Sequence, residues 1–146
     1  MPPAPNRPAT IILDGEAVQA LKDVDHPKHS NALAIIQVVN DRHRRRADSP
    51  RIVVPVAVRV EAGWERSHRS SAHINWLTRA TDWPLTTERT DHAARIRADA
   101  QVSVVDATVG QAAHECPKPV TIVTSDVEDM TRLAGQLRGK VRVAPL

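Results

Sequence analysis

Apolar residues along the chain follow two kinds of pattern, short continuous runs and longer stripes spaced for a helix. Two of the runs lead directly to acidic positions: Ala9 to Leu13 is followed by Asp14, and Val120 to Thr124 is followed by Ser125 and Asp126. Short apolar runs bounded by polar residues are typical of buried strands. Further strands are expected at 51–54, more weakly at 83–87, and at 141–143.

Helix-spaced apolar positions fill the segments between these runs. Ser125 followed by Glu128 predicts the start of the last helix by the capping-box rule, and Gly139 lies beyond its expected end. The third and fourth helices should form a helical hairpin or arm. Helices are expected at 15–22, at 31–46, around Val56, Val60 and Trp64, around Ile74, Trp76 and Leu77, at 88–100, around Val109, Ala112, Ala113 and Cys116, and around Met130, Leu133, Ala134 and Leu137.

Alternation of strands and helices favours an α/β fold with a parallel sheet covered on both faces, because a parallel crossover needs a connection of helix length. The chain has 146 residues, of which 41% are hydrophobic, enough for one core. We expect a single domain over 9–146 behind a flexible Pro-rich leader at 1–8. The sequence has no Phe, no Tyr and three Trp, so aliphatic side chains must fill the core.

Composition narrows the functional classes. No apolar stretch is long enough to span a membrane and the N-terminal residues lack the apolar core of a secretory signal, so we expect a cytoplasmic protein without membrane association. The single cysteine, Cys116, cannot form an internal disulfide and is interpreted as buried filler. The histidines do not fall into a zinc spacing, and His114 and Cys116 would lie on different helix faces, so zinc is not predicted.

Acidic residues occur where a parallel sheet would gather them. Asp14 and Asp126 follow strands, whose carboxyl ends meet at one edge of such a sheet. Asp106 follows an apolar run and would open a helix, and Glu61 lies beside Val60 on a predicted inward-facing stripe. Taken singly, Asp14 and Asp106 are explained as helix N-caps, Asp126 as a first-turn acid, and Glu61 as a partly exposed helix residue.

Taken together, four converging carboxylates would repel one another unless they were protonated or accompanied by a cation. Oxygen ligands suit Mg²⁺, with Mn²⁺ as a possible substitute. The sequence therefore predicts a divalent-metal site, provided that folding brings these acids together.

The order and surroundings of these acids resemble those of PIN-domain ribonucleases, especially VapC-type toxins of bacterial toxin–antitoxin pairs. The segments that carry the resemblance span almost the whole chain and are IILD, VRVEAGW, VSVVDATVGQAA and TIVTSDVEDM. It implies a three-layer α/β/α sandwich with a central parallel sheet of four to five strands. It also implies metal binding and catalysis by Asp14, Glu61, Asp106 and Asp126, with Asp129 as an auxiliary metal ligand.

The activity implied is that of a Mg²⁺-dependent endoribonuclease, a hydrolase in which metal-activated water attacks an RNA phosphodiester. Asp14, Asp106 and Asp126 would be the main ligands, whereas Glu61 would orient water or bind a second ion. The sequence departs from many relatives at Gly15, where they carry Ser or Thr after the first Asp. Ser125 could partly replace that hydroxyl.

Two alternatives stay open. The first is a catalytically silent PIN-fold module that binds RNA or protein, and Gly15 is its main support. The second is a phosphoacceptor regulator, since Asp14 ends a strand, but neither the expected acceptor position nor a suitable Lys can be assigned.

The partners implied are an RNA substrate, a cognate antitoxin and a second copy of the chain in a homodimer. A basic run at 42–46 could attract phosphate, or could equally be a solvated helix C-terminus. Trp64 and Trp76 either line an antitoxin groove near the third and fourth helices or pack in the core. The cations considered for RNA are Arg42, Arg44, Arg45, Arg46 and Arg59.

Overall fold

A parallel sheet of five strands forms the centre of the computed structural model, which describes residues 8–44 and 50–146. The strands are β1 (Thr10–Leu13), β2 (Arg51–Pro55), β3 (Thr81–Trp83), β4 (Val120–Thr124) and β5 (Val141–Pro145). Their order across the sheet is β3-β2-β1-β4-β5, with every neighbouring pair parallel. Of the predicted leader, only Pro8 lies within the described residues, and Arg45 and Arg46 of the basic run lie outside them.

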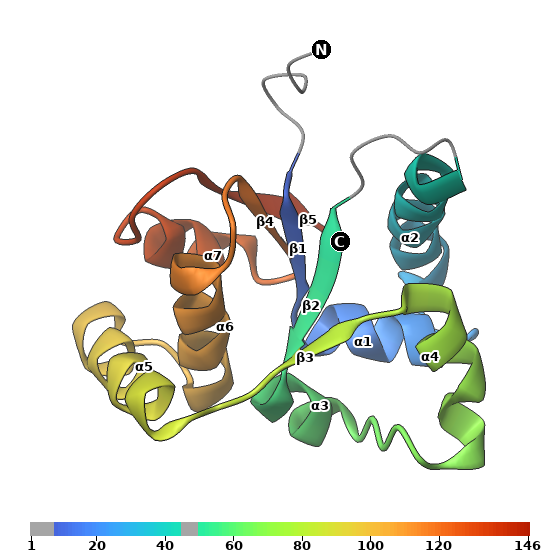
Figure 1. Ribbon diagram of the computed structural model, residues 1–146, viewed down its shortest axis with the longest axis horizontal. Coiled ribbons are helices and arrows are strands. Elements are labelled where there is room, and N and C mark those ends of the chain that lie inside the picture. The colour runs from blue at the N-terminus through green and yellow to red at the C-terminus, as the bar shows by residue number, and fades with distance from the viewer. Residues whose placement is uncertain (1–7, 45–49) are drawn as a thin grey trace.

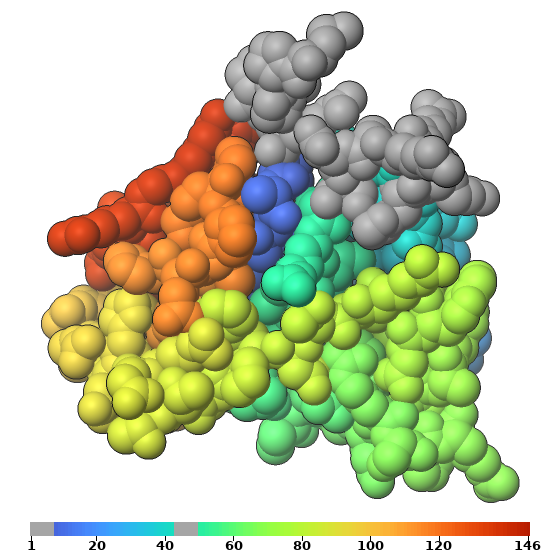
Figure 2. All heavy atoms as spheres, in the orientation of Figure 1, coloured from blue at the N-terminus to red at the C-terminus, as the bar shows by residue number. Residues whose placement is uncertain are grey.

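Helices cover both faces of this sheet (Figure 1). They are α1 (Gly15–Lys22), α2 (His29–Arg44), α3 (Val56–Ala62), the 3₁₀ turn η1 (Arg69–Ser71), α4 (Ala72–Thr78), α5 (Thr87–Ala100), α6 (Val104–Glu115) and α7 (Val127–Ala134). Helices α1, α2 and α4 lie on one side of the strands, and α6 and α7 lie on the other, with α5 packed against α6 (Figures 1 and 2). The architecture is the predicted α/β sandwich.

The core is aliphatic, as the composition predicts. Strand β1 is buried along its whole length between β2 and β4, with Ile12 opposite Val53 on one side and Ile122 on the other. Strands that are covered on both faces have nearly continuous runs of apolar residues, which explains why β1 and β4 were predicted at the correct positions. Cys116 is buried at 3% exposure, in agreement with its predicted role as core filler. None of the described helices is long and apolar enough to cross a membrane.

The predicted strand at 83–87 is wrong in position. Strand β3 covers Thr81–Trp83 and stops before Pro84, which has no N–H to donate to a ladder. The hydroxyl of Thr86 accepts a hydrogen bond from the backbone N–H of Arg89 at 3.3 Å and so caps α5. The chain thus turns into a helix where the apolar residues suggested a strand.

The predicted stripe on the third helix is also wrong. Helix α3 ends at Ala62, because Gly63 adopts a left-handed conformation with φ of 64°, and Trp64 lies beyond it. The buried side chains are Val58 and Ala62, whereas Val60 is 82% exposed. Helix α3 packs against α1 and α6, and α3 and α4 do not pack against each other as a hairpin.

Candidate metal centre

Asp14 is placed by the end of β1 and the start of α1. Its carboxylate Oδ1 accepts a hydrogen bond from the backbone N–H of Ala17 at 2.9 Å, which confirms the predicted N-cap. The residue is 6% exposed, and burial raises the pKa of its carboxyl above the ordinary value. A hydrogen bond with the Thr124 side chain opposes that rise, while the charges of Glu16 and Glu61 add to it. A buried acid near other acids is the first element of the site.

Asp126 lies at the equivalent place after β4, the strand that pairs with β1. Its backbone N–H donates to the Thr124 hydroxyl at 2.9 Å, and its own Oδ1 accepts from the backbone N–H of Asp129 at 3.3 Å. Asp126 is therefore the N-cap of α7, and the predicted capping box of Ser125 and Glu128 is wrong by one residue. The hydrogen bond to Thr124 forms a turn between β4 and α7, and this turn holds Asp126 beside the end of the strand.

Asp106 lies in the first turn of α6 and does not open the helix as predicted. The N-cap is Ser103, whose Oγ accepts from the backbone N–H of Asp106 at 3.1 Å. Burial, followed by the charges of Asp126, Asp14 and Glu61, raises the pKa of Asp106 to about 6, against a lowering hydrogen bond from Ser103. The charges of Asp126, Asp14 and Glu61 therefore all act on the Asp106 carboxyl.

Asp129 belongs to the most compact part of this group. One carboxylate oxygen from each of Asp106, Asp126 and Asp129 lies within 4.8 Å of the other two. The Asp129 carboxylate also forms an ion pair, with 3.0 Å between its Oδ1 and Nη2 of Arg132. The resemblance treated Asp129 as auxiliary, and the structure includes it in the same compact group as Asp106 and Asp126.

Glu61 lies on α3, outside the compact group of Asp106, Asp126 and Asp129. The side chain is exposed, and its carboxylate lies against Gly15 at the start of α1. Helix α1 holds the end of α3 by two side chains: Gln19 Nε2 donates to the Ala62 carbonyl at 3.2 Å, and Lys22 Nζ donates to the same carbonyl at 2.9 Å. Glu61 is therefore placed by contacts between helices, since the predicted inward-facing stripe does not exist.

The donor set fits a hard divalent cation. Every candidate ligand is a carboxylate oxygen, which is the chemistry that Mg²⁺ and Mn²⁺ prefer. The raised pKa of Asp106 reflects partly buried negative charges that lack full compensation, and a cation among them would favour the ionised form. Asp106, Asp126 and Asp129 are close enough to share one ion, with Asp14 and Glu61 acting on the same region.

Two residues that sequence reasoning did not single out help to build the site. Thr124 links Asp14 and Asp126 through one hydroxyl, and Ser103 caps the helix that carries Asp106. Both were accessible from the sequence. Ser103 precedes Asp106 by three residues, the spacing applied to Ser125 and Glu128, and Thr124 stands at the end of an apolar run before an Asp.

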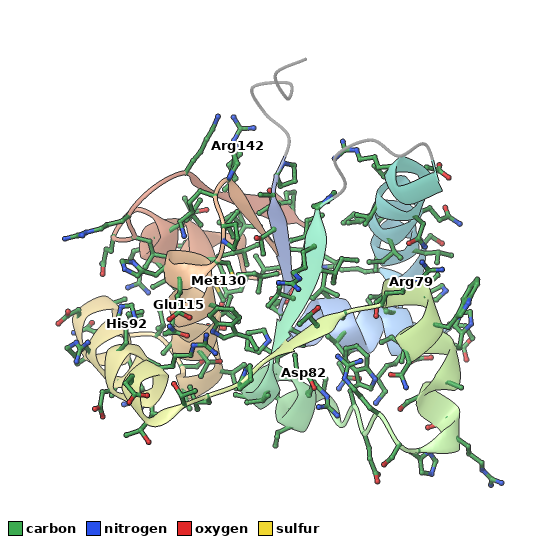
Figure 3. The ribbon with its side chains drawn as sticks, in the orientation of Figure 1. Arg79, Asp82, His92, Glu115, Met130 and Arg142 are labelled. Carbon is green, nitrogen blue, oxygen red and sulfur yellow. The ribbon has the colours of Figure 1, made fainter. Side chains whose placement is uncertain are left out.

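Of the predicted RNA-binding cations, Arg42 and Arg59 have side chains that the structure describes. Helix α2 ends near the start of β2, at the amino edge of the sheet, so Arg42 in its last turn lies away from the carboxyl edge (Figure 1). Arg59 lies on α3 but forms an ion pair with Asp82 at 3.0 Å, and Arg66 binds the same carboxylate at 2.8 Å. Figure 3 shows Asp82 where β3 passes near α3.

The two tryptophans near the arm have different environments. Trp64 is 2% exposed, donates from Nε1 to the Asn75 side chain at 2.9 Å, and stacks under the Arg66 guanidinium at 4.3 Å. It is a core residue, and it also forms part of the lining of a groove with Val60 and Glu65. Trp76 is 68% exposed on α4 and is free to meet a partner.

No family model and no curated protein sequence matches the chain, but its fold matches solved structures. VapBC2 from Rickettsia felis, solved bound to a DNA fragment from their promoter, matches with a TM-score of 0.59 and 11% identity over 94% of this chain and 98% of that chain. PAE2754 from Pyrobaculum aerophilum matches with a TM-score of 0.50 and 15% identity over 92% and 83%.

At these identities the likeness establishes the fold. The chain has a PIN-like α/β fold with an all-parallel sheet, and the predicted resemblance to VapC-type PIN domains is confirmed at that level. An acidic cluster at the carboxyl edge accompanies the fold.

Proposed function

We propose that this protein is a divalent-metal-dependent endoribonuclease and the toxin of a toxin–antitoxin pair. The observation that carries the proposal is the grouping of Asp106, Asp126 and Asp129, with one oxygen of each within 4.8 Å, at a point where Asp14 and Glu61 also act. Carboxylates held this close together repel one another, and a bound cation relieves that repulsion.

In the proposed site Asp14, Asp106, Asp126 and Asp129 hold Mg²⁺ or Mn²⁺. Such an ion, when bound, lowers the pKa of a coordinated water and neutralises charge that develops on phosphate. Asp14 and Asp126 each use Oδ1 as a helix cap, which fixes the carboxylates and leaves their second oxygens for the ion. Glu61 is exposed and orients water at the open side of the group. Hydrolysis of this kind needs no nucleophilic side chain.

The partners follow from the resemblance and are proposals. RNA is the substrate, a cognate antitoxin is the inhibitor, a second copy of the chain completes a homodimer, and the protein acts in the cytoplasm. Exposed apolar side chains on α3 and α4, Val60 at 82% and Trp76 at 68%, support a protein-binding surface near the site. Val60 lines a groove of about 400 Å³ together with Arg59, Trp64 and Glu65.

The test is cleavage of structured RNAs by the purified protein with Mg²⁺, with Mn²⁺ and with EDTA. Asp14→Asn, Asp106→Asn and Asp126→Asn should each abolish metal-dependent cutting and retain the fold. Asn is preferred to Ala because Asn is an equally good N-cap, so the helix starts at Asp14 and Asp126 stay capped.

Asp23→Asn is the matched control for these variants. Asp23 is exposed at the other end of α1, and its side chain also accepts a backbone hydrogen bond, from Asp25 at 2.9 Å. The control should cut as the wild type does. Cutting that survives in all three site variants would come from a contaminant and would end the proposal.

A catalytically silent PIN-fold binding module is the second candidate. The observation in its favour is the Asp129–Arg132 ion pair at 3.0 Å, since Arg132 supplies part of the positive charge that a metal would otherwise bring. Weak or absent Mn²⁺ binding in an electron paramagnetic resonance titration, together with no cleavage of any RNA tested, would favour this module over the enzyme.

A further inference from the structure

Gly15, the first residue of α1, has no room for a side chain. A Cβ built on its backbone would lie 2.1 Å from Oε1 of Glu61 and 3.3 Å from Cδ of the same carboxylate. Heavy atoms do not approach so closely without a shift. The Glu61 carboxylate therefore occupies the volume that any residue other than glycine would need at this position.

Helix α3 is held so that it cannot simply retreat from a larger residue. Gln19 and Lys22 of α1 both donate to the carbonyl of Ala62, the residue after Glu61, at 3.2 and 2.9 Å. Lys22 also donates to the Gly63 carbonyl at 3.0 Å. The part of the contact that can move is the Glu61 side chain, because its carboxylate is the far end of a flexible, exposed chain.

Moving that side chain costs the fold little. An exposed Glu61 loses no core packing when it rotates into solvent, and a residue with a Cβ restricts the unfolded chain more than glycine does. The consequence of a side chain at position 15 falls instead on the acid group, where the charge of Glu61 acts on Asp14 and Asp106.

We infer that Gly15 is a positioning residue, whose missing Cβ keeps the Glu61 carboxylate beside Asp14 at the rim of the metal centre. The role in metal binding rests on the proposed function. From the sequence, Gly15 was interpreted as the loss of a hydroxyl. In the structure, the absence of a side chain at Gly15 leaves space that the Glu61 carboxylate fills. Gly15→Ser would therefore displace Glu61 and would not restore a more effective site.

The experiment compares Gly15→Ala and Gly15→Ser with Gly135→Ala as the matched control. A Cβ at Gly135 would meet its nearest atom, the Arg132 carbonyl oxygen, at 3.5 Å, an ordinary contact. Both Gly15 variants should bind Mn²⁺ about 10-fold more weakly, the size of effect expected when the orientation of a metal site is disturbed. Their melting temperatures in EDTA should equal or exceed that of the wild type. Gly135→Ala should retain wild-type affinity.

A Glu61→Ala background separates steric positioning from any other effect of the substitution. With the carboxylate removed, Gly15→Ala should cause no further loss of Mn²⁺ affinity. Wild-type affinity in Gly15→Ala, or an equal loss in the two backgrounds, would overturn the inference.

Crystal structures of the metal-free wild type and Gly15→Ala give a readout that does not depend on metal. The Glu61 carboxylate should be rotated away in the variant while the backbones of α1 and α3 stay in place. An unmoved carboxylate would contradict the inference. If the wild type binds no Mn²⁺, the proposed function fails, and these structures still decide whether Gly15 places Glu61.

Discussion

The Thr124 hydroxyl, a neutral group, orients two acidic residues of like charge, Asp14 and Asp126. It accepts from the backbone N–H of Asp126 at 2.9 Å and also hydrogen bonds the Asp14 carboxylate, where it lowers the pKa. Desolvation of Asp14 outweighs this help, so its pKa is still raised. A neutral hydroxyl thus orients the acids without compensating their negative charge. A bound cation would reduce the remaining unfavourable electrostatic energy.

Asp106 makes the stability of the metal-free protein depend on pH. Its folded pKa of about 6 lies above the ordinary value, so the native state holds a proton that the unfolded chain releases. The associated stability is present in full below the unfolded pKa and is lost as pH rises through about 6. We expect the free energy of unfolding in EDTA, measured with urea, to fall between about pH 4 and about pH 7.

Asp106→Asn provides the control for this prediction, because the amide has the same shape and does not titrate. The variant should show a smaller fall over the same range, with the remainder due mainly to Asp14, whose pKa is also raised. Identical pH profiles for the wild type and Asp106→Asn would argue against the assignment.

The two tryptophans of the arm should respond differently to truncation. Trp64→Ala removes a side chain that is 2% exposed and leaves Asn75 without its hydrogen-bond donor, so the loss should be about 3–5 kcal/mol. Trp76 is 68% exposed, and Trp76→Ala should change stability by no more than about 0.5 kcal/mol. Urea unfolding of both variants tests this, and a comparable loss in Trp76→Ala would be the contrary result.

At the scale of elements, helix α6 carries Asp106 and must pack closely on α7, which carries Asp129. Gly110 of α6 makes the close approach possible: a Cβ there would lie 2.9 Å from Cδ2 of Leu133 and 3.2 Å from its Cδ1. Leu133 is fully buried, so unlike Glu61 it has no solvent to move into.

Gly110→Ala should therefore destabilise the protein. Overpacking costs about 1–3 kcal/mol, and the better helix propensity of Ala returns up to about 1 kcal/mol. In a Leu133→Ala background the added methyl group has room, so the same substitution should cost much less. Equilibrium unfolding of the wild type, the two single variants and the double variant gives the coupling free energy between the two positions. If Gly110→Ala lowers the free energy of unfolding equally in both backgrounds, Leu133 is not the obstacle.

At the scale of the whole molecule, the metal centre joins segments that are distant in sequence. Asp14, Glu61, Asp106 and Asp126 come from four different connections around the sheet, so an ion bound among them would tie these connections together. A ligand that binds only the folded state stabilises it by about 2.7 kcal/mol at a concentration of one hundred times its Kd.

We expect Mn²⁺ to raise the melting temperature by several degrees above that in EDTA, with NaCl at matched ionic strength as the control. Asp126→Asn should lose most of this increase, because it keeps the helix cap and removes the charge. Asp129→Asn should reduce it as well, given that its oxygen lies within the group that spans 4.8 Å. An increase that persists in both variants would place the ion elsewhere.

The local pattern of apolar residues was sufficient to predict the positions of several strands and helices. The runs before Asp14 and Asp126 became β1 and β4, and the stripe from Val109 to Cys116 became the buried face of α6, because burial on fixed faces imposes a periodicity on the sequence. The stripe on α3 failed because Gly63 ends that helix before Trp64. The interval of four residues was a coincidence.

The sequence by itself determined the alternation of strands and helices, the aliphatic core and the acids at strand ends, since these depend on neighbouring residues. Only the tertiary structure decided that Asp129 lies within reach of Asp106, that the helix carrying Arg42 ends at the opposite edge of the sheet, and that Gly15 makes room for Glu61. Those relations depend on how helices pack across the sheet, and the distances that packing sets have no counterpart in the spacing of residues along the chain.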